Sequence, residues 1–352
     1  MSLREKLHDI VLKYQKKTPH LQVHLQSSLL EHSYAYGTQG SEQPFHSASV
    51  GKMMTAVLVI ALIEQSKLDW DTPVNTLLDA TSLNHLFVVK GVDYQNEVTI
   101  HHLLSHTSGV NDYFDGKTKG HPRFLKEVLK NQDRFYHPTE LIQFTQYHQQ
   151  AIGKPGSQFL YSDTGYLLLG LICEAVYQKP FYQILKDELF IPLEMKDTGL
   201  LFYDPSCQVE RLAPVMVYHQ DLRLKPVLSI DFSGGGLSTT LTDLARFLNA
   251  LQQGNVVSQE SLAKMRVFQN RFIPGIQYGL GLMEVQFEKL FFLLKGFPRL
   301  YGHLGVLGVH AWIDPESNDA FVINVSDMGK MGLSFRLLIE LVSLLKKERQ
   351  KK

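Results

Sequence analysis

The chain has 352 residues, and its 35 basic and 35 acidic side chains balance to a formal net charge of zero with histidine neutral. This balance predicts no general attraction to nucleic acid or to an anionic membrane surface. A hydrophobic content of 44% with 20% charged residues is typical of a globular protein. The length allows one large domain or two smaller ones.

The N-terminal stretch "MSLREKLHDIVLKYQKK" is predicted to form a charged, amphipathic helix. It has no apolar signal region and no small-residue cleavage site, so the sequence as written predicts a cytoplasmic protein. A chain whose signal had been removed would look the same. Two strands are expected next, around "LQVHLQ" and "HSYAYG".

The stretch "FHSASVGKMMTAVLVIALIEQ", residues 45–65, predicts a buried helix. From Met53 to Ile63 the apolar residues cover every face of the helix rather than one stripe. The run is too short to span a membrane, which takes about 20 apolar residues. Ser47 or Ser49 is expected to cap the first turn with its hydroxyl.

Ser49 and Lys52 lie three residues apart, so on a helix their side chains share a face and touch. Burial and the positive end of the helix dipole both disfavour the ammonium form of a lysine. We therefore expect Lys52 to be neutral, or to share its proton with a partner, and to accept a proton from Ser49. The backbone N–H groups at the helix start are placed to stabilise an oxyanion when the serine attacks a carbonyl group.

The bare serine-lysine spacing is not specific. It recurs at Ser261 with Lys264 and at Ser343 with Lys346, where both lysines are expected to be hydrated. Only Lys52 is followed by a long apolar run. The alternative for this stretch is a structural helix start whose lysine extends to solvent.

The rest of the chain predicts a sheet made from both ends with helices between. Residues 71–205 contain mostly helical patterns, whereas strands return after residue 206. The later strands are expected in "GGGLSTT", "QYGLGLMEVQF", "KLFFLL", "LYGHLG", "GVHAWID" and "AFVINVS", ahead of a C-terminal helix. We predict a discontinuous α/β domain of residues 1–70 and 206–352, and a helical domain of residues 71–205.

Two cysteines, Cys173 and Cys207, do not make a disulfide scaffold. One bridge between them stays possible. Because Cys173 lies in the apolar stretch "YLLLGLICEAV", we expect two reduced thiols.

Two further stretches carry residues able to complete an acyl-transfer site, which needs a second proton carrier. "GSQFLYSDTGYLLLG" places Tyr161 and Asp163 on a turn before a buried helix. "RLYGHLGVLGVHAW" places His303 on an expected strand, with Gly305 allowing close backbone approach. Taken alone, each is more often a packed structural residue.

The ordered blocks "SASVGKMMTA", "TIHHLLSHTSG", "GSQFLYSDTGYLLLG", "GGGLSTTLTDLARFL", "YGLGL" and "YGHLGVLG" resemble the serine β-lactamase-like superfamily. The resemblance covers roughly Phe45 to Val325 and is close to class C β-lactamases, D-Ala-D-Ala carboxypeptidases and related esterases. It implies an antiparallel sheet flanked by helices, an inserted helical domain, and an active site in the cleft between the two domains.

The resemblance also implies the roles of individual residues. Ser49 of the S-x-x-K motif is the nucleophile that becomes acylated, and Lys52 is its proton acceptor or electrostatic partner. Tyr161 is the general base and acid, and His303 lines the opposite wall. The oxyanion hole is formed by the backbone N–H groups of Ser49 and Val306, the residue after Gly305.

A tyrosine base needs support, because its ordinary pKa is about 10. A cationic Lys52 or a charged His303 would stabilise the phenolate. Whether Lys52 or Tyr161 takes the proton first stays open, and the pair can titrate as one unit.

Two residues depart from the family pattern. Asp163 stands where the third residue of the tyrosine motif is often asparagine, which removes an amide donor to a substrate carbonyl. His303 stands where class C β-lactamases have lysine, so the permanent cation that holds a substrate carboxylate is missing. We therefore expect weak or no β-lactamase activity, and a His303 charge that varies with pH near neutrality.

No metal or organic cofactor is expected. His101, His102 and His106 lack an acidic or cysteine partner at a ligand spacing. The glycines at 234–236 are not followed by G-K-[ST], so they predict a structural turn rather than a phosphate loop. "LFFLL" is expected in the core or at the rim of the active site.

The sequence thus predicts a serine hydrolase that forms an acyl-enzyme with a small ester, amide or peptide substrate. It predicts no nucleic-acid partner and no membrane segment, and leaves the oligomeric state open. The alternative is a penicillin-binding or sensor-type protein that keeps the fold and turns over little.

Overall fold

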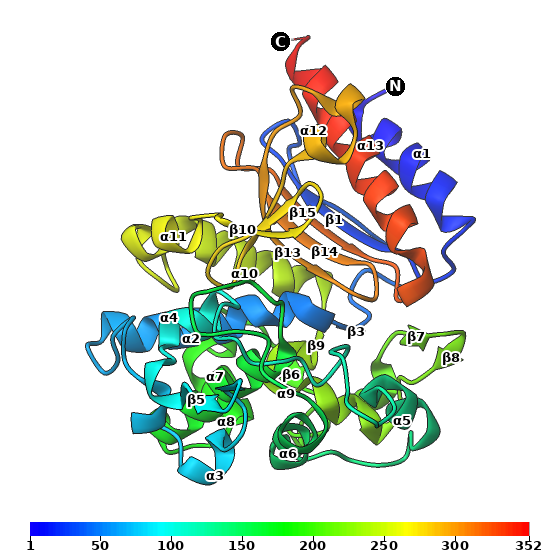
Figure 1. Ribbon diagram of the computed structural model, residues 1–352. Helices are drawn as coiled ribbons and strands as arrows, with labels where there is room; N and C mark the ends of the chain where they lie inside the picture. The colour runs from blue at the N-terminus through cyan, green and yellow to red at the C-terminus, as the bar shows by residue number, and fades with distance from the viewer. Residues whose placement is uncertain (352) are drawn as a thin grey trace.

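The computed structural model describes residues 1–351 and contains one large antiparallel sheet (Figure 1). The strand order is β10-β11-β12-β13-β14-β15-β1-β2. The strands are β1 (Gln22–Gln26), β2 (Tyr34–Gly37), β10 (Asn270–Ile273), β11 (Ile276–Tyr278), β12 (Met283–Val285), β13 (Leu300–Gly305), β14 (Val309–Ile313) and β15 (Ala320–Asn324). The pairing of β1 with β15, from Gln22 opposite Asn324 to Gln26 opposite Ala320, joins the two ends of the chain.

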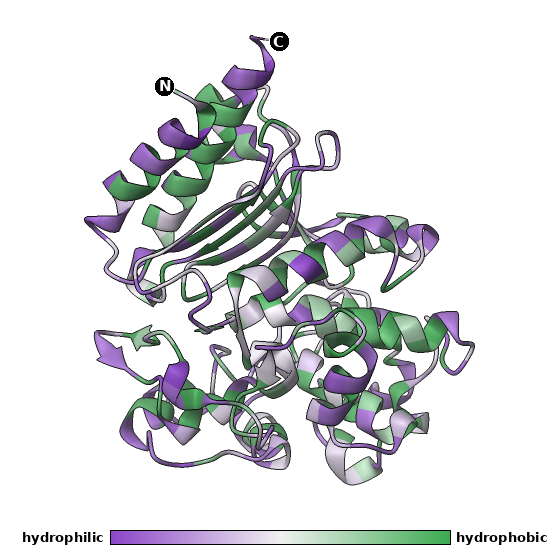
Figure 2. Cartoon of the chain, turned by 180° about the vertical axis from the view of Figure 1, so that it is seen from behind, coloured by the Kyte–Doolittle hydropathy of each residue, from purple (hydrophilic) through white to green (hydrophobic). Residues whose placement is uncertain are grey.

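Helices cover both faces of this sheet. The terminal helices α1 (Leu3–Gln15) and α13 (Met331–Arg349) pack against each other on one side, and α10 (Leu241–Gln253) contacts β14, β15 and β1 from the other (Figure 1). Figure 2 shows the mixed surfaces of α1 and α13, with hydrophobic residues on the side toward the sheet. The prediction of a mixed fold of helices and an antiparallel sheet is confirmed.

The central strands are buried on both faces, and their side chains alternate between two hydrophobic cores. Phe321 and Ile323 of β15 belong to the core under α1 and α13, whereas Val322 belongs to the core on the opposite side. This alternation follows from the two-residue period of a strand. It explains why β14 and β15 read as almost continuous apolar runs.

The second core surrounds α2 (Lys52–Glu64), which is apolar on nearly every face and packs against α7 (Asp163–Tyr177) and α9 (Phe232–Gly235). This confirms the predicted buried helix. The same core includes residues of α4 (Ile100–Leu104) and of α10, so it is shared by distant parts of the sequence. The proposed domain boundaries at residues 71 and 205 stay a prediction.

The other helices are α3 (Ala80–Leu83), α5 (Phe124–Lys130), α6 (Pro138–His148), α8 (Phe181–Leu185), α11 (Gln259–Met265) and α12 (Phe287–Leu290), and the 3-10 helix η1 (Ala48–Gly51) precedes α2. A second, three-stranded sheet has the order β3 (Phe45–His46), β9 (Leu237–Thr239) and β6 (Gly199–Leu200). Two strand pairs are separate from both sheets: β4 (Val88–Val89) with β5 (Val92–Asp93), and β7 (Met216–Val217) with β8 (Gln220–Asp221). Strand β3 leads directly into η1 and α2.

The prediction for "KLFFLL" was wrong. The segment after β12 forms α12 and a short 3-10 turn instead of a strand, and Phe292 is 73% exposed. Phe287 inserts into the core beneath the sheet and Leu290 and Leu294 pack against it, whereas Phe291 and Leu293 are exposed like Phe292. In "GGGLSTT" the strand is limited to Leu237–Thr239, because the preceding glycines belong to α9 and the turn after it.

Both cysteines are free, with Cys173 buried. Among residues 1–351, no helix combines the length and the apolar character that crossing a membrane requires.

Candidate active site

Ser49 lies on a sharp turn between β3 and α2. It sits in η1, and the preceding Ala48 has a φ of 47°. Gly235 packs directly against this turn, since a Cβ on Gly235 would come 2.0 Å from the Ala48 carbonyl oxygen. The expected serine cap of α2 was wrong, because η1 extends the helix backwards and the Ser47 hydroxyl donates to the Gly235 carbonyl at 2.7 Å.

Lys52 is fully buried at the first residue of α2. Its Nζ lies 3.2 Å from Ser49 Oγ, donates to the Gly234 carbonyl at 2.7 Å, and forms an ion pair with Asp163. Burial alone lowers the pKa of Lys52, but the negative charge of Asp163 and the Tyr161 hydroxyl raise it above its ordinary value. The expectation of a neutral Lys52 was wrong; the geometry fits the alternative of a lysine that shares its proton with a partner.

Asp163 begins α7 and is held from its other side by Asp112. The Asp163 N–H donates to Asp112 Oδ1 at 2.9 Å, and Asp112 also accepts from the N–H groups of Phe114 and Asp115. Burial raises the pKa of Asp163, opposed by Lys52. Burial and the nearby Asp163 charge raise the pKa of Asp112 to about 7. Two carboxyl groups and one ammonium group therefore lie close together in a buried site, where the charge of Asp163 raises the pKa of both Lys52 and Asp112.

The Tyr161 side chain lies beside the Lys52 ammonium group, and its hydroxyl is free of hydrogen bonds. The Lys52 Nζ is 5.0 Å from the centre of the Tyr161 ring. The hydroxyl is buried and has no hydrogen-bond partner of good geometry, although Ser49 and Lys52 lie near enough to affect its titration. Burial raises the pKa of Tyr161 to about 12, against the lowering effect of the Lys52 charge.

His303 lies behind Tyr161 rather than on the surface of the cleft. It is fully buried on β13, with its ring centre 6.3 Å from that of Tyr161, and its Nδ1 accepts the Leu304 N–H at 3.0 Å. Burial and the charge of Lys52 lower the pKa of His303 to about 3. The expectation that His303 titrates near neutrality was wrong, because the buried imidazole is neutral there.

The end of β13 approaches the Ser49 turn closely. A Cβ on Gly305 would come 2.7 Å from the Ala48 Cβ and 3.3 Å from the Ser49 nitrogen. Within residues 1–351, the backbone N–H groups of Ser49 and Val306 donate no hydrogen bond. Both residues line the same cleft, so the geometry is compatible with the predicted oxyanion hole.

The three histidines near residue 101 form no metal site. His106 is buried, its Nδ1 accepts the Ser162 N–H at 3.0 Å, and its ring packs against Tyr161 and Tyr278. In the described part of the chain, no three histidine, cysteine or acidic side chains are grouped to hold a metal ion. His106 therefore supports the position of Tyr161.

The cleft above Ser49 has a volume of about 480 Å³. It is lined by four carboxylates, Asp112, Asp115, Asp163 and Asp231, and mainly by apolar and aromatic side chains that include Phe114, Leu125, Tyr161, Tyr218, Phe272, Met283, Val306, Met331 and Phe335. None of the described residues that line it is lysine, arginine or histidine. A substrate carboxylate would therefore meet carboxylates rather than a cation.

Sequence reasoning missed Asp112 and the Gly234 carbonyl. Asp112 lies 51 residues from Asp163, and no spacing in the sequence connects the two. The glycine turn at 234–236 was expected to be structural, yet its backbone is one of the three partners of Lys52. Only the fold brings these groups together.

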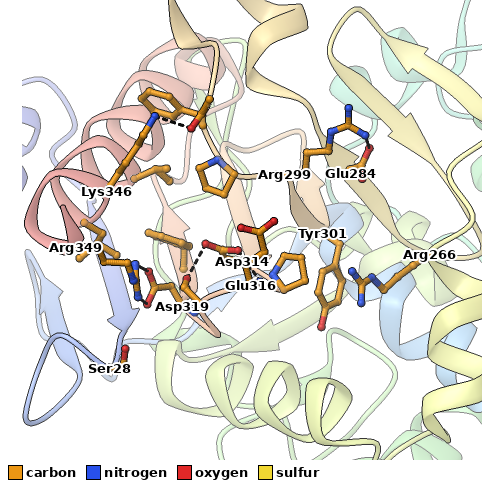
Figure 3. Close-up of a pocket in the computed structure, with 18 of the residues that line it drawn as sticks. Ser28, Arg266, Glu284, Arg299, Tyr301, Asp314, Glu316, Asp319, Lys346 and Arg349 are labelled. Carbon is orange, nitrogen blue, oxygen red and sulfur yellow. Dashed lines mark hydrogen bonds and ion pairs between the residues drawn. The ribbon is translucent and has the colours of Figure 1, made fainter. Parts of the chain in front are cut away.

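A larger cavity, of about 1070 Å³, is lined by residues that include parts of β12, β13, β15 and α13 (Figure 3). Four of its charged side chains pair with one another, in the contacts of Arg349 with Asp319 and of Arg299 with Glu284. None of the predicted site residues lines it. The candidate active site is therefore the smaller cleft that contains Ser49.

The fold is that of β-lactamase and transpeptidase-type proteins. The Beta-lactamase family model matches residues 31–341, so the chain belongs to that family.

Individual relatives agree with this assignment. Penicillin-binding protein 4* of Bacillus subtilis is 29% identical over 259 residues, which are 66% of this chain and 51% of the relative. The chain thus spans about half the length of that curated relative.

Solved structures share the fold across nearly the whole chain. D-amino acid amidase from Ochrobactrum anthropi SV3, complexed with L-phenylalanine, has a TM-score of 0.80 and 22% identity, covering 99% of this chain and 100% of its own. EstCE1, a hydrolase with promiscuous acyltransferase activity, has a TM-score of 0.75 and 20% identity, covering 97% and 98%. At these identities the likeness concerns the fold alone.

Proposed function

We propose that this protein is a serine hydrolase that cleaves small esters or amides through an acyl-enzyme on Ser49. The observation that carries the proposal is the contact of Ser49 Oγ with a buried lysine whose charge is fixed by Asp163. A structural helix start would not require a buried ammonium beside an accessible hydroxyl in a cleft.

Tyr161 is the proton acceptor in this proposal. Lys52 is already protonated, whereas Tyr161 lines the cleft and its buried hydroxyl is free of hydrogen bonds. Forming phenolate at pH 7 from a pKa of about 12 costs about 7 kcal/mol. This cost fits within the barrier of roughly 16 kcal/mol that corresponds to a turnover of about 10 per second.

The reaction begins when Tyr161 loses its own proton to solvent and becomes a phenolate. Ser49 Oγ then bonds to the substrate carbonyl carbon while its proton passes to the Tyr161 phenolate, and the N–H groups of Ser49 and Val306 stabilise the oxyanion. The bond to the leaving group then breaks, and Tyr161 returns the proton to the departing oxygen or nitrogen. Water repeats the sequence on the ester, with Tyr161 as base, and releases the acid and free Ser49.

The charges of the residues in and behind the cleft indicate the class of substrate. The described residues that line the cleft include no cation, and the neutral His303 supplies none from behind. Substrates without a carboxylate beside the scissile bond are therefore favoured, which disfavours penicillins and peptides ending in free D-alanine. The name of the amidase supports an amide substrate, and the description of EstCE1 as a hydrolase with acyltransferase activity supports acyl transfer.

Steady-state hydrolysis tests the proposal. p-Nitrophenyl acetate and D-phenylalanine amide should be turned over by the wild type and not by Ser49→Ala, and a chromogenic cephalosporin should be opened slowly or not at all. Turnover that survives Ser49→Ala would contradict the proposal. A stable penicillin adduct without ester turnover would favour the sensor-type alternative.

A further inference from the structure

A small apolar pocket opens beside the nucleophile. Its volume is about 40 Å³, and most of its wall consists of aliphatic side chains from α5, β7 and the segment before α9, among them Leu125, Val128, Val215, Val217, Leu222 and Val227. It shares Ala48, Leu125 and Val306 with the main cleft, so the two spaces meet next to Ser49.

The two polar residues in this wall lie beside each other. His46 Nδ1 accepts the Ala48 N–H at 2.9 Å, which places the ring hydrogen on Nε2, and Nε2 lies 3.2 Å from Asp231 Oδ2. The imidazole is thus anchored to the Ser49 turn through Nδ1, and its Nε2 lies beside the Asp231 carboxylate without a hydrogen bond of good geometry. The rest of the wall is apolar.

The position of the pocket distinguishes the two halves of a substrate. The leaving group must face Tyr161, because Tyr161 returns the proton to it. Neither Tyr161 nor Lys52 lines the small pocket, whereas Val306, one expected oxyanion donor, and Ala48, the residue before the other donor Ser49, do. The carbonyl carbon under attack carries an oxygen, a leaving group and an acyl chain. Because the oxygen faces the oxyanion donors and the leaving group faces Tyr161, the acyl chain is the substituent that can enter the small pocket.

We propose that this pocket binds the acyl chain of the substrate and selects short or branched aliphatic acyl groups. The inference rests on the proposed function and adds the substrate class. A water-sized group needs roughly 10–15 Å³ of such space, so the pocket holds about three methyl-sized groups. Butyryl and isobutyryl chains, each with three carbons beyond the carbonyl group, match this size, and longer chains must remain in the main cleft.

Leu125 lies where its side chain can control the entry of an acyl chain from the main cleft into the small pocket. It is half-buried on α5 and lines both the pocket and the cleft. Leu129, on the same helix and also half-buried, lines neither space. The two leucines therefore provide a matched pair of substitutions.

The test measures kcat/KM for p-nitrophenyl acetate, butyrate, isobutyrate and octanoate, each divided by its rate of hydrolysis with hydroxide. Burial of one methylene corresponds to about fourfold in kcat/KM, so butyrate should exceed acetate by about 15-fold. In Leu125→Phe the butyrate-to-acetate ratio should fall toward one, while Leu129→Phe should keep the wild-type ratio. Leu125→Ala should move the optimum to longer chains.

A second series keeps the acyl group as acetyl and varies the alcohol from methyl to butyl. Chain-length selectivity in this series that is lost in Leu125→Phe would assign the pocket to the leaving group and overturn the inference. An unchanged butyrate-to-acetate ratio in Leu125→Phe, with Ser49 still active, would overturn the inference and leave the hydrolase proposal standing. Absence of both ester turnover and Ser49 labelling would overturn the two together.

Discussion

Lys52 and Asp163 form a buried ion pair at the point where α2 and α7 both begin. The same lysine reaches Ser49, so the charge state of the nucleophile's neighbour is set by a residue 111 positions away in the sequence. Because a buried ammonium without a counter-charge is costly, Asp163 is what allows Lys52 to remain cationic.

Replacement of Asp163 by asparagine should lower the pKa of Lys52, since the largest factor that raises it disappears while burial remains. We expect the folded state to lose about 3 kcal/mol, and the activity of the variant to fall more steeply than that of wild type as pH rises toward 10. Urea unfolding and pH-rate profiles measure the two effects. Glu260→Gln, which breaks the exposed pair with Lys264, is the control and should leave both unchanged. Identical profiles for Asp163→Asn and wild type would contradict the role of this pair.

Tyr161→Phe should separate activity from stability. The lost hydroxyl has no hydrogen-bond partner, so its removal should leave the free energy of unfolding unchanged or slightly raised. Loss of a general base should reduce kcat by about 10²–10⁴-fold. Ester turnover and thermal unfolding of the same preparation provide the measurement, and full activity in the variant would exclude Tyr161 as the base.

Asp112 should make stability depend on pH. Its pKa rises from 3.8 to about 7 on folding, so between these values the native state holds a proton that the unfolded chain has released. Stability should therefore fall as pH rises from about 4 to 7, by about 4 kcal/mol at most, and stay level above. Urea unfolding at pH 5 and pH 8 should show this difference in wild type and a smaller one in Asp112→Asn. An equal difference in both would show that other groups are responsible.

Gly305→Ala tests the contact between β13 and the Ser49 turn. The added methyl group would come 2.7 Å from the Ala48 Cβ, so the strand and the turn must separate. We expect a loss of about 1–3 kcal/mol of stability and a larger loss of acylation rate. Gly332→Ala in α13 is the control, because its Cβ would meet nothing within 4 Å and should be neutral or stabilising. A Gly305→Ala enzyme as active as the control would contradict the close approach.

The elements with a strong local pattern could be predicted from the sequence. The all-apolar run of α2 and the alternating or fully apolar strands β1, β14 and β15 identified the core, and the serine-lysine spacing identified the contact of Ser49 with Lys52. Family resemblance located Tyr161, whose free hydroxyl now supports its assignment.

Titration states and long-range partners could not be predicted in this way. The sequence shows that Lys52 and His303 carry ionisable groups, but the fold determines which charges lie beside them. The pKa of Lys52 is therefore raised and that of His303 lowered. Lys52 gains Asp163 and stays charged, whereas His303 gains only burial and the field of Lys52 and stays neutral. The prediction for the segment after β12 was wrong for a related reason, because the five consecutive apolar residues 290–294 carry no period that distinguishes a strand from an exposed turn.

The most direct test of the central claim is the intact mass of the protein after incubation with a fluorophosphonate probe, for wild type and for Ser49→Ala. We predict one adduct in the wild type, mapped by peptide analysis to Ser49, and none in the variant. An unmodified wild type, or an adduct that persists in Ser49→Ala, would contradict this prediction.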